Sequence, residues 1–117
     1  MRNLVVYTDT EDLDPTEGID LLRKNGFEVL ILNTKDPHEI TEAAKEATAL
    51  LVGYAPITEQ MIEQMPKLKI VSMLGTGYDN VDANALRSRN IALATLGGLP
   101  AEEVATHTAA LILGALR

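Results

Sequence analysis

Short apolar runs alternate with amphipathic stretches along the chain, and this alternation predicts strands and helices in turn. The runs predicted as strands cover residues 4–7, 27–32, 49–52, 69–74 and 91–94. In the stretches between them, apolar residues recur at helical spacing. Residues that favour helix starts open these stretches, namely Pro15, Pro37, Thr58 and Asp82. A last helix is expected over residues 101–116.

Strands that alternate with helices through short loops are typical of an α/β fold. We expect a flavodoxin-like, doubly wound five-stranded parallel sheet of order 2-1-3-4-5, arranged in three layers with helices on both faces. No linker or change in composition divides residues 1–117, so a single domain is expected. In such sheets a ligand binds beyond the carboxyl ends of the strands.

Composition and charge narrow the classes of function. The net charge of −7 argues against nucleic acids and anionic membranes as partners. The absence of cysteine excludes disulfides and thiolate chemistry. No apolar stretch is long enough for a signal peptide or a membrane span, so a cytoplasmic location is expected.

The fourth predicted strand leads into the glycine pair of Gly75-Thr76-Gly77, which raises the question of a dinucleotide site. That fingerprint needs a third glycine three residues later, and it belongs after the first strand of its unit. Asn80 occupies the position of the third glycine. The motif is therefore rejected as a Rossmann signature.

The same sheet edge is also where a flavin mononucleotide site or a phosphate-receiver site would lie. A flavin mononucleotide site is disfavoured because four carboxylates would repel its phosphate in the loop after the first strand, namely Asp9, Glu11, Asp12 and Asp14. A phosphate-receiver domain fails because Gly53-Tyr54-Ala55 stands where its acceptor aspartate should follow the third strand. The acidic run itself is interpreted as a solvated loop, with a metal site as the alternative.

The segment GTGYDNVD, together with Glu103-Val104-Ala105 at a helix start, resembles the N-terminal substrate-binding domain of the D-isomer-specific 2-hydroxyacid dehydrogenases. The resemblance extends over essentially the whole chain. It implies that the loop of Gly75, Thr76 and Gly77 covers a small 2-oxo or 2-hydroxy acid, with backbone amides near the acid's carboxylate. It also implies that Tyr54 and Ala55 form another wall of this cleft.

The same resemblance implies that a full-length parent uses NAD(P), bound by a further domain that carries the catalytic histidine and a carboxylate-binding arginine. His38, at a helix start, and His107, within the last predicted helix, are not assigned such roles. The chain is interpreted as a truncated substrate-binding domain that binds its acid at most weakly, with no cofactor, catalytic residue or catalysis of its own. The alternatives are an oxidoreductase fragment that works only with the missing cofactor domain, and the disfavoured flavin protein.

The last predicted helix also suggests a partner. Apolar residues surround its second half, including Ala109, Ala110, Leu113 and Leu116. A helix that is apolar on all sides is buried on more than one side. We therefore expect a homodimer through residues 101–116, while simple packing of this helix on the sheet is the alternative.

Overall fold

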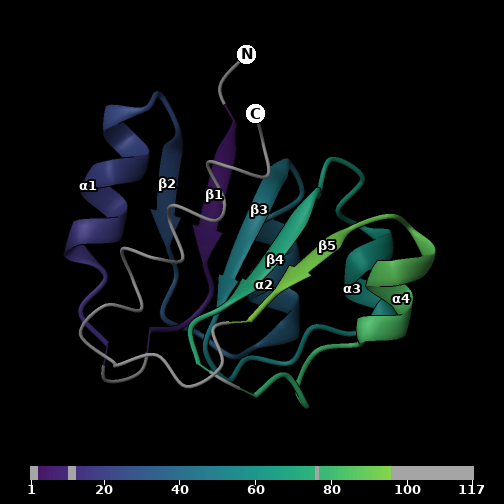
Figure 1. Cartoon of the computed structure of the whole chain (residues 1–117). Helices are drawn as coiled ribbons and strands as arrows, with labels where there is room; N and C mark the ends of the chain where they lie inside the picture. The colour runs from purple at the N-terminus through teal and green to yellow at the C-terminus, as the bar shows by residue number, and fades with distance from the viewer. Residues whose placement is uncertain (1–2, 11–12, 76, 96–117) are drawn as a thin grey trace.

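A single sheet of five parallel strands organises the computed structural model, which describes residues 3–10, 13–75 and 77–95 (Figure 1). The strands are β1 (Leu4–Tyr7), β2 (Glu28–Ile31), β3 (Ala47–Val52), β4 (Ile70–Met73) and β5 (Ala92–Ala94). Their order, β2-β1-β3-β4-β5, confirms the predicted doubly wound arrangement. All of the strand pairings are parallel.

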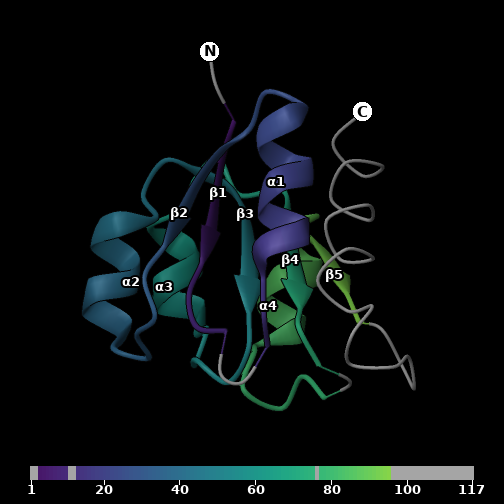
Figure 2. The ribbon, with the colours of Figure 1, turned by 90° about the vertical axis from the view of Figure 1, so that its left-hand side faces the viewer.

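The helices cover both faces of the sheet (Figures 1 and 2). Helix α1 (Thr16–Lys24) lies on one face. Helices α2 (Pro37–Ala43), α3 (Glu59–Glu63) and α4 (Ala83–Ser88) lie on the other. The helix expected over residues 101–116 lies outside the described residues, so the structure leaves that prediction and the dimer contact open.

Side-chain caps fix the starts of three of these helices. Asp36, Thr58 and Asp82 each accept a hydrogen bond from a backbone N–H in the first turn of α2, α3 and α4. The predicted caps at Thr58 and Asp82 are thereby confirmed. Helix α1 begins differently, because the Asp14 carboxylate accepts from the hydroxyl and the backbone N–H of Thr16, and these bonds lower the pKa of Asp14.

Strand β3 is longer than its apolar run predicts. It starts at Ala47 rather than at residue 49, and all of its residues are buried. The polar residue Thr48 fits inside because its hydroxyl donates to the carbonyl oxygen of Leu4 at 3.1 Å. A satisfied hydroxyl costs little on burial, so the strand extends through it.

Alternate strand residues build two separate cores, one on each face of the sheet. Val6, Leu50 and Val71 pack with residues of α2, α3 and α4. Tyr7 and Leu51 pack with residues of α1 on the opposite face. The hydroxyls of Tyr7 and Ser72 are buried there, and neither has a hydrogen-bond partner within the described part of the chain. Burial raises the pKa of Tyr7 to about 12.

Strand β2 forms one edge of the sheet. Its Leu30 and Ile31 are each 38% exposed, and Glu28 at its start is exposed as well. Asn33 follows with a positive φ of 54°, and the backbone N–H of Thr34 after it still donates to the carbonyl oxygen of Thr8 at 2.8 Å. Within the described residues, no helix is long and apolar enough to cross a membrane.

Candidate functional site

The loops that follow β1, β3 and β4 meet at the carboxyl edge of the sheet (Figure 1). Strands β3 and β4 are neighbours in which Val52 pairs with Met73. The backbone N–H of Leu74 continues this pairing to the carbonyl oxygen of Val52 at 2.8 Å. The predicted site residues Tyr54 and Ala55 therefore leave the sheet beside the strand that leads to Gly75 and Gly77. Thr76 lies outside the described residues.

A buried carboxylate holds the loop after β3. Asp9 is 4% exposed, and its carboxylate accepts the backbone N–H groups of Gly53 at 3.1 Å, Tyr54 at 2.6 Å and Ala55 at 3.2 Å. The hydroxyl of Thr8 donates to the same carboxylate at 2.8 Å. The expectation that Asp9 belongs to a solvated acidic run was therefore wrong. Three consecutive N–H groups that leave a sheet need an acceptor, and a carboxylate supplies several lone pairs at once.

The close approach of Asp9 explains the glycine at position 53. A Cβ atom at Gly53 would lie 2.7 Å from an Asp9 carboxylate oxygen and 2.9 Å from the Asp9 backbone oxygen. Both distances are shorter than any normal contact of carbon with oxygen. Gly53 is thus required by packing against Asp9.

Asn80 fastens the same loop from the other side. Its side-chain amide donates to the carbonyl oxygen of Ala55 at 2.7 Å and lies 3.5 Å from that of Gly53. Backbone bonds of Ile57 with Asn80 and Asp82, both at 2.9 Å, extend the connection. The segment after the glycine pair and the loop after β3 are therefore joined into one unit.

The predicted site residues differ sharply in what they present to solvent. Tyr54 is 69% exposed, and the ammonium of Lys35 lies 5.7 Å from the centre of its ring. Ala55 is fully buried, and its N–H and carbonyl groups are both engaged, so it supports the loop from behind. Gly75 and Gly77 are exposed, and a Cβ atom added at either would meet no described residue within 4 Å. Gly75 does not have a positive φ.

The described residues do not fit a nucleotide cofactor. A dinucleotide pyrophosphate sits at a helix N-terminus directly after the glycine loop, but α4 starts only at Ala83. The side chain of Asn80, which stands in place of the third glycine, is committed to Ala55. A flavin phosphate would bind in the loop after β1, and the buried Asp9 carboxylate in that loop would repel it.

The histidines, Met73 and the acidic side chains add no catalytic or metal-binding group at this edge within the described residues. His38 is exposed in the first turn of α2, as predicted, and His107 lies outside the described residues. Met73 is fully buried, so its side chain faces the core. Among the described residues, no group of three or more acidic or histidine side chains could hold a metal ion. Glu11 and Asp12 of the acidic run are outside them.

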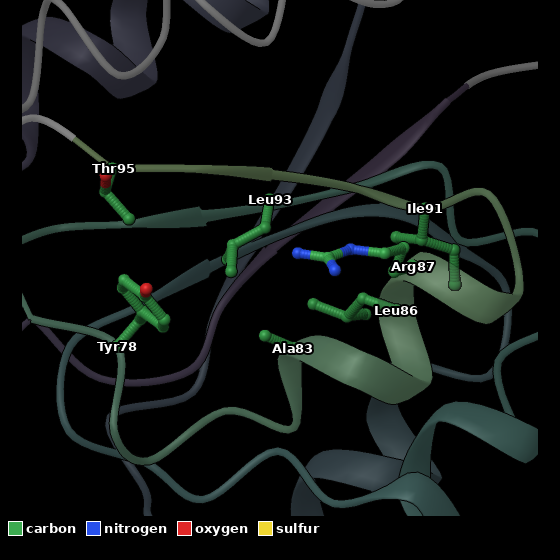
Figure 3. Close-up of a pocket in the computed structure, with 7 residues that line it drawn as sticks. All are labelled: Tyr78, Ala83, Leu86, Arg87, Ile91, Leu93 and Thr95. Atoms are coloured by element: carbon green, nitrogen blue, oxygen red, sulfur yellow. The ribbon is translucent and has the colours of Figure 1, made fainter.

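A separate pocket lies between α4 and β5, with a volume of about 390 Å³ (Figure 3). Its lining comes from α4, from alternate residues along β5 and from the segment after the glycine pair; it comprises Tyr78, Ala83, Leu86, Arg87, Ile91, Leu93 and Thr95. None of the predicted site residues lines it. Sequence reasoning missed this pocket and Asp9. A signal existed for both, because Ala83, Leu86 and Arg87 share a helical face and Asp9 follows a buried central strand.

Comparisons with known proteins agree with the fold and its motifs. The sequence profile described as "D-isomer specific 2-hydroxyacid dehydrogenase, catalytic domain" matches residues 5–110. A D-3-phosphoglycerate dehydrogenase of Archaeoglobus fulgidus is 32% identical over 86% of this chain. A glyoxylate/hydroxypyruvate reductase B of Yersinia enterocolitica is 34% identical over 80% of it. The crystal structure of an NAD⁺-bound 3-phosphoglycerate dehydrogenase of Entamoeba histolytica superposes on 80% of the chain with a TM-score of 0.69 and 28% identity.

These matches cover only part of each similar protein. The aligned region is 19% of the Archaeoglobus protein, 28% of the Yersinia protein and 32% of the Entamoeba protein. The chain thus spans between about a fifth and about a third of the length of these relatives.

Proposed function

Because the chain belongs to the D-isomer specific 2-hydroxyacid dehydrogenase family, within the region of its catalytic domain, we propose that it is a substrate-binding domain for small 2-oxo or 2-hydroxy acids. The backbone N–H groups of Thr76 and Gly77 would bind the acid's carboxylate, with Gly75 leaving room for its approach. Tyr54 would form the neighbouring wall, and Ala55 would support that wall from behind. Thr76 enters this proposal through the family resemblance, because it lies outside the described residues.

The observation that carries this proposal is the contrast between the glycines at the sheet edge. Gly53 has no room for a side chain because Asp9 fills the space. No described residue lies within 4 Å of a Cβ atom added at Gly75 or Gly77, so packing within the described part of the chain does not require glycine at either position. Glycine also permits close approach of a ligand to the backbone. A small anion beside these amides would make use of that space.

The loop after β3 is a poor alternative position for the acid's carboxylate. Asp9 already occupies the N–H groups of Tyr54 and Ala55. A substrate carboxylate would meet the Asp9 charge there, and repulsion between like charges in a partly buried place is costly. Among the described residues, those after β4 give no hydrogen bond to Asp9, so that segment is the more favourable position for an anion.

We propose that this chain alone does not transfer hydride, since its described residues do not fit a nicotinamide cofactor. The second candidate function is oxidoreductase activity together with an NAD(P)-binding domain. That candidate is favoured by the relatives that carry dehydrogenase and reductase names. It predicts turnover of a 2-oxo acid when such a domain is supplied, and none from the chain alone. A cytoplasmic location and a homodimer through residues 101–116 remain proposals from the sequence.

Titration of ¹⁵N-labelled protein with glyoxylate or pyruvate tests substrate binding. We expect saturable shifts of the Gly75 and Gly77 amides with a Kd of about 1 mM or weaker. Hydroxyacetone, which lacks the carboxylate, serves as the ligand control and should give no such shifts. Gly77→Val should abolish the shifts by blocking the amide while leaving the unfolding midpoint unchanged, because the space is open. Absence of saturable shifts in the unmodified protein would refute the proposal.

A further inference from the structure

The pocket between α4 and β5 combines apolar walls with a few converging polar groups. Leu86, Ile91 and Leu93 supply apolar surface, and the guanidinium of Arg87 extends into the space between helix and strand (Figure 3). The Tyr78 ring closes the opposite end. A volume of about 390 Å³ lies within the range of small-molecule sites.

The charge of Arg87 identifies the kind of ligand. Three other basic side chains have acidic partners: Arg89 pairs with Glu63 at 3.4 Å, Lys45 pairs with Glu42 at 3.3 Å, and Lys67 pairs with Glu46. Among the described residues, no acidic side chain lies within salt-bridge distance of Arg87. A guanidinium beside apolar walls favours an anion, and its planar fork matches a carboxylate.

We propose that this pocket binds a small organic monocarboxylate with an apolar body. The carboxylate lies on the Arg87 guanidinium, and the body packs against Leu86, Ile91 and Leu93. This site is distinct from the one proposed for 2-oxo acids, because Tyr54, Gly75 and Gly77 do not line the pocket. It therefore stands or falls independently of the proposed function.

Titration of ¹⁵N-labelled protein with hexanoate tests the proposal. We expect saturable shifts at the amides of Leu86, Ile91 and Leu93, with a Kd in the millimolar range. Hexanamide, which keeps the body but not the charge, and inorganic phosphate, which keeps a charge but no body, should each bind at least about tenfold more weakly. Equal binding of either compound would overturn the proposal, as would the absence of saturable shifts with hexanoate.

Variants of two arginines localise the contact. Arg87→Gln should weaken hexanoate binding at least about tenfold, and Arg87→Lys should give an intermediate loss because it keeps the charge without the fork. Arg89→Gln is the matched control: it removes the arginine at the C-cap of α4, which pairs with Glu63 and lies outside the pocket, and it should leave binding unchanged. Both arginines are exposed, so the variants should keep the unfolding midpoint. Equal effects of Arg87→Gln and Arg89→Gln would refute the assignment.

Discussion

Tyr7 places a polar group without a hydrogen-bond partner among the described residues inside a core. It ends β1, is fully buried and packs with residues of α1, yet its hydroxyl has no partner within the described part of the chain. Burial of an unpaired hydroxyl is unfavourable, and burial of the ionised form would cost more. The raised pKa of Tyr7, about 12, reflects this second cost.

The Tyr7 hydroxyl should make stability fall at high pH. An unfolded tyrosine loses its proton near pH 10, whereas folded Tyr7 keeps it up to about pH 12. The unfolded state therefore binds fewer protons than the folded state between pH 10 and pH 12. The contribution of Tyr7 to the stability of the folded state is complete below pH 10 and is lost as the pH rises towards 12. We expect Tyr7 to account for a loss of about 2 kcal/mol in the free energy of unfolding across this window, measured by urea denaturation.

Tyr7→Phe isolates this effect from other groups that titrate in alkali. At neutral pH the variant should be as stable as the unmodified protein or slightly more stable, because the removed hydroxyl has no partner. Above pH 10 it should lose less stability. Parallel pH profiles for the two proteins would contradict the explanation.

Asp9 marks the limit of what the sequence reveals about single residues. Its neighbours Glu11, Asp12 and Asp14 made it look like one member of a solvated acidic run. Its actual partners are the N–H groups of residues 53–55, more than forty positions away. Only the adjacency of β1 and β3 in the sheet brings them together, and a local pattern cannot report such a contact.

At the scale of elements, the loop after β3 is held through both its backbone N–H groups and a backbone carbonyl group. Asp9 takes its N–H groups, and Asn80 takes the carbonyl of Ala55. These bonds set the position of the exposed Tyr54 ring relative to the segment that follows the glycine pair. A loop fixed in this way is preorganised, which lowers the cost of ordering it around a ligand.

Asp9→Asn should release this loop. The substituted amide would place a donor against backbone donors, and we expect a loss of about 2–3 kcal/mol in the free energy of unfolding. Asp20→Asn, at an exposed position of α1, is the control and should change stability by less than about 0.5 kcal/mol. Urea denaturation measures both. A similar small effect for both variants would show that Asp9 does not hold the loop.

Helices and strands were predictable where the spacing of apolar residues and the capping residues indicated the same limits. The caps at Thr58 and Asp82 and the run of β1 were confirmed at their predicted places. The start of β3 was misplaced because Thr48 reads as polar, whereas in the fold its hydroxyl is satisfied by Leu4. Strand limits depend on such cross-strand partners, which the sequence does not display.

At the scale of the whole molecule, the sheet separates two cores, and the same strands contribute side chains to both. Neighbouring residues of β3 point to opposite sides, so Leu50 belongs to the core of α2, α3 and α4 and Leu51 to the core of α1. The alternation of strands and helices was enough to predict this layered plan. It could not predict the pocket beside Arg87, because that pocket depends on how α4 is spaced from β5.

Leu50→Ala and Leu51→Ala compare the two cores with equal substitutions. Both side chains are fully buried, and each variant should lose about 2–5 kcal/mol. Because both cores rest on the same strands, we expect α1 and α2 to unfold at one urea midpoint in each variant. Amide signals of the two helices, followed by NMR, measure this. Separate midpoints for α1 and α2 in Leu51→Ala would show that the cores unfold independently.

The exposed edge at β2 bears on how the protein behaves in crowded solution. A sheet edge with apolar side chains can template strand addition between molecules, and Leu30 and Ile31 are such side chains. The strand at this edge is only four residues long and begins with the charged Glu28. With a net charge of −7 the molecules also repel one another at neutral pH. Colloidal stability should therefore be lowest near the isoelectric point of about 4.7, where that repulsion between molecules vanishes.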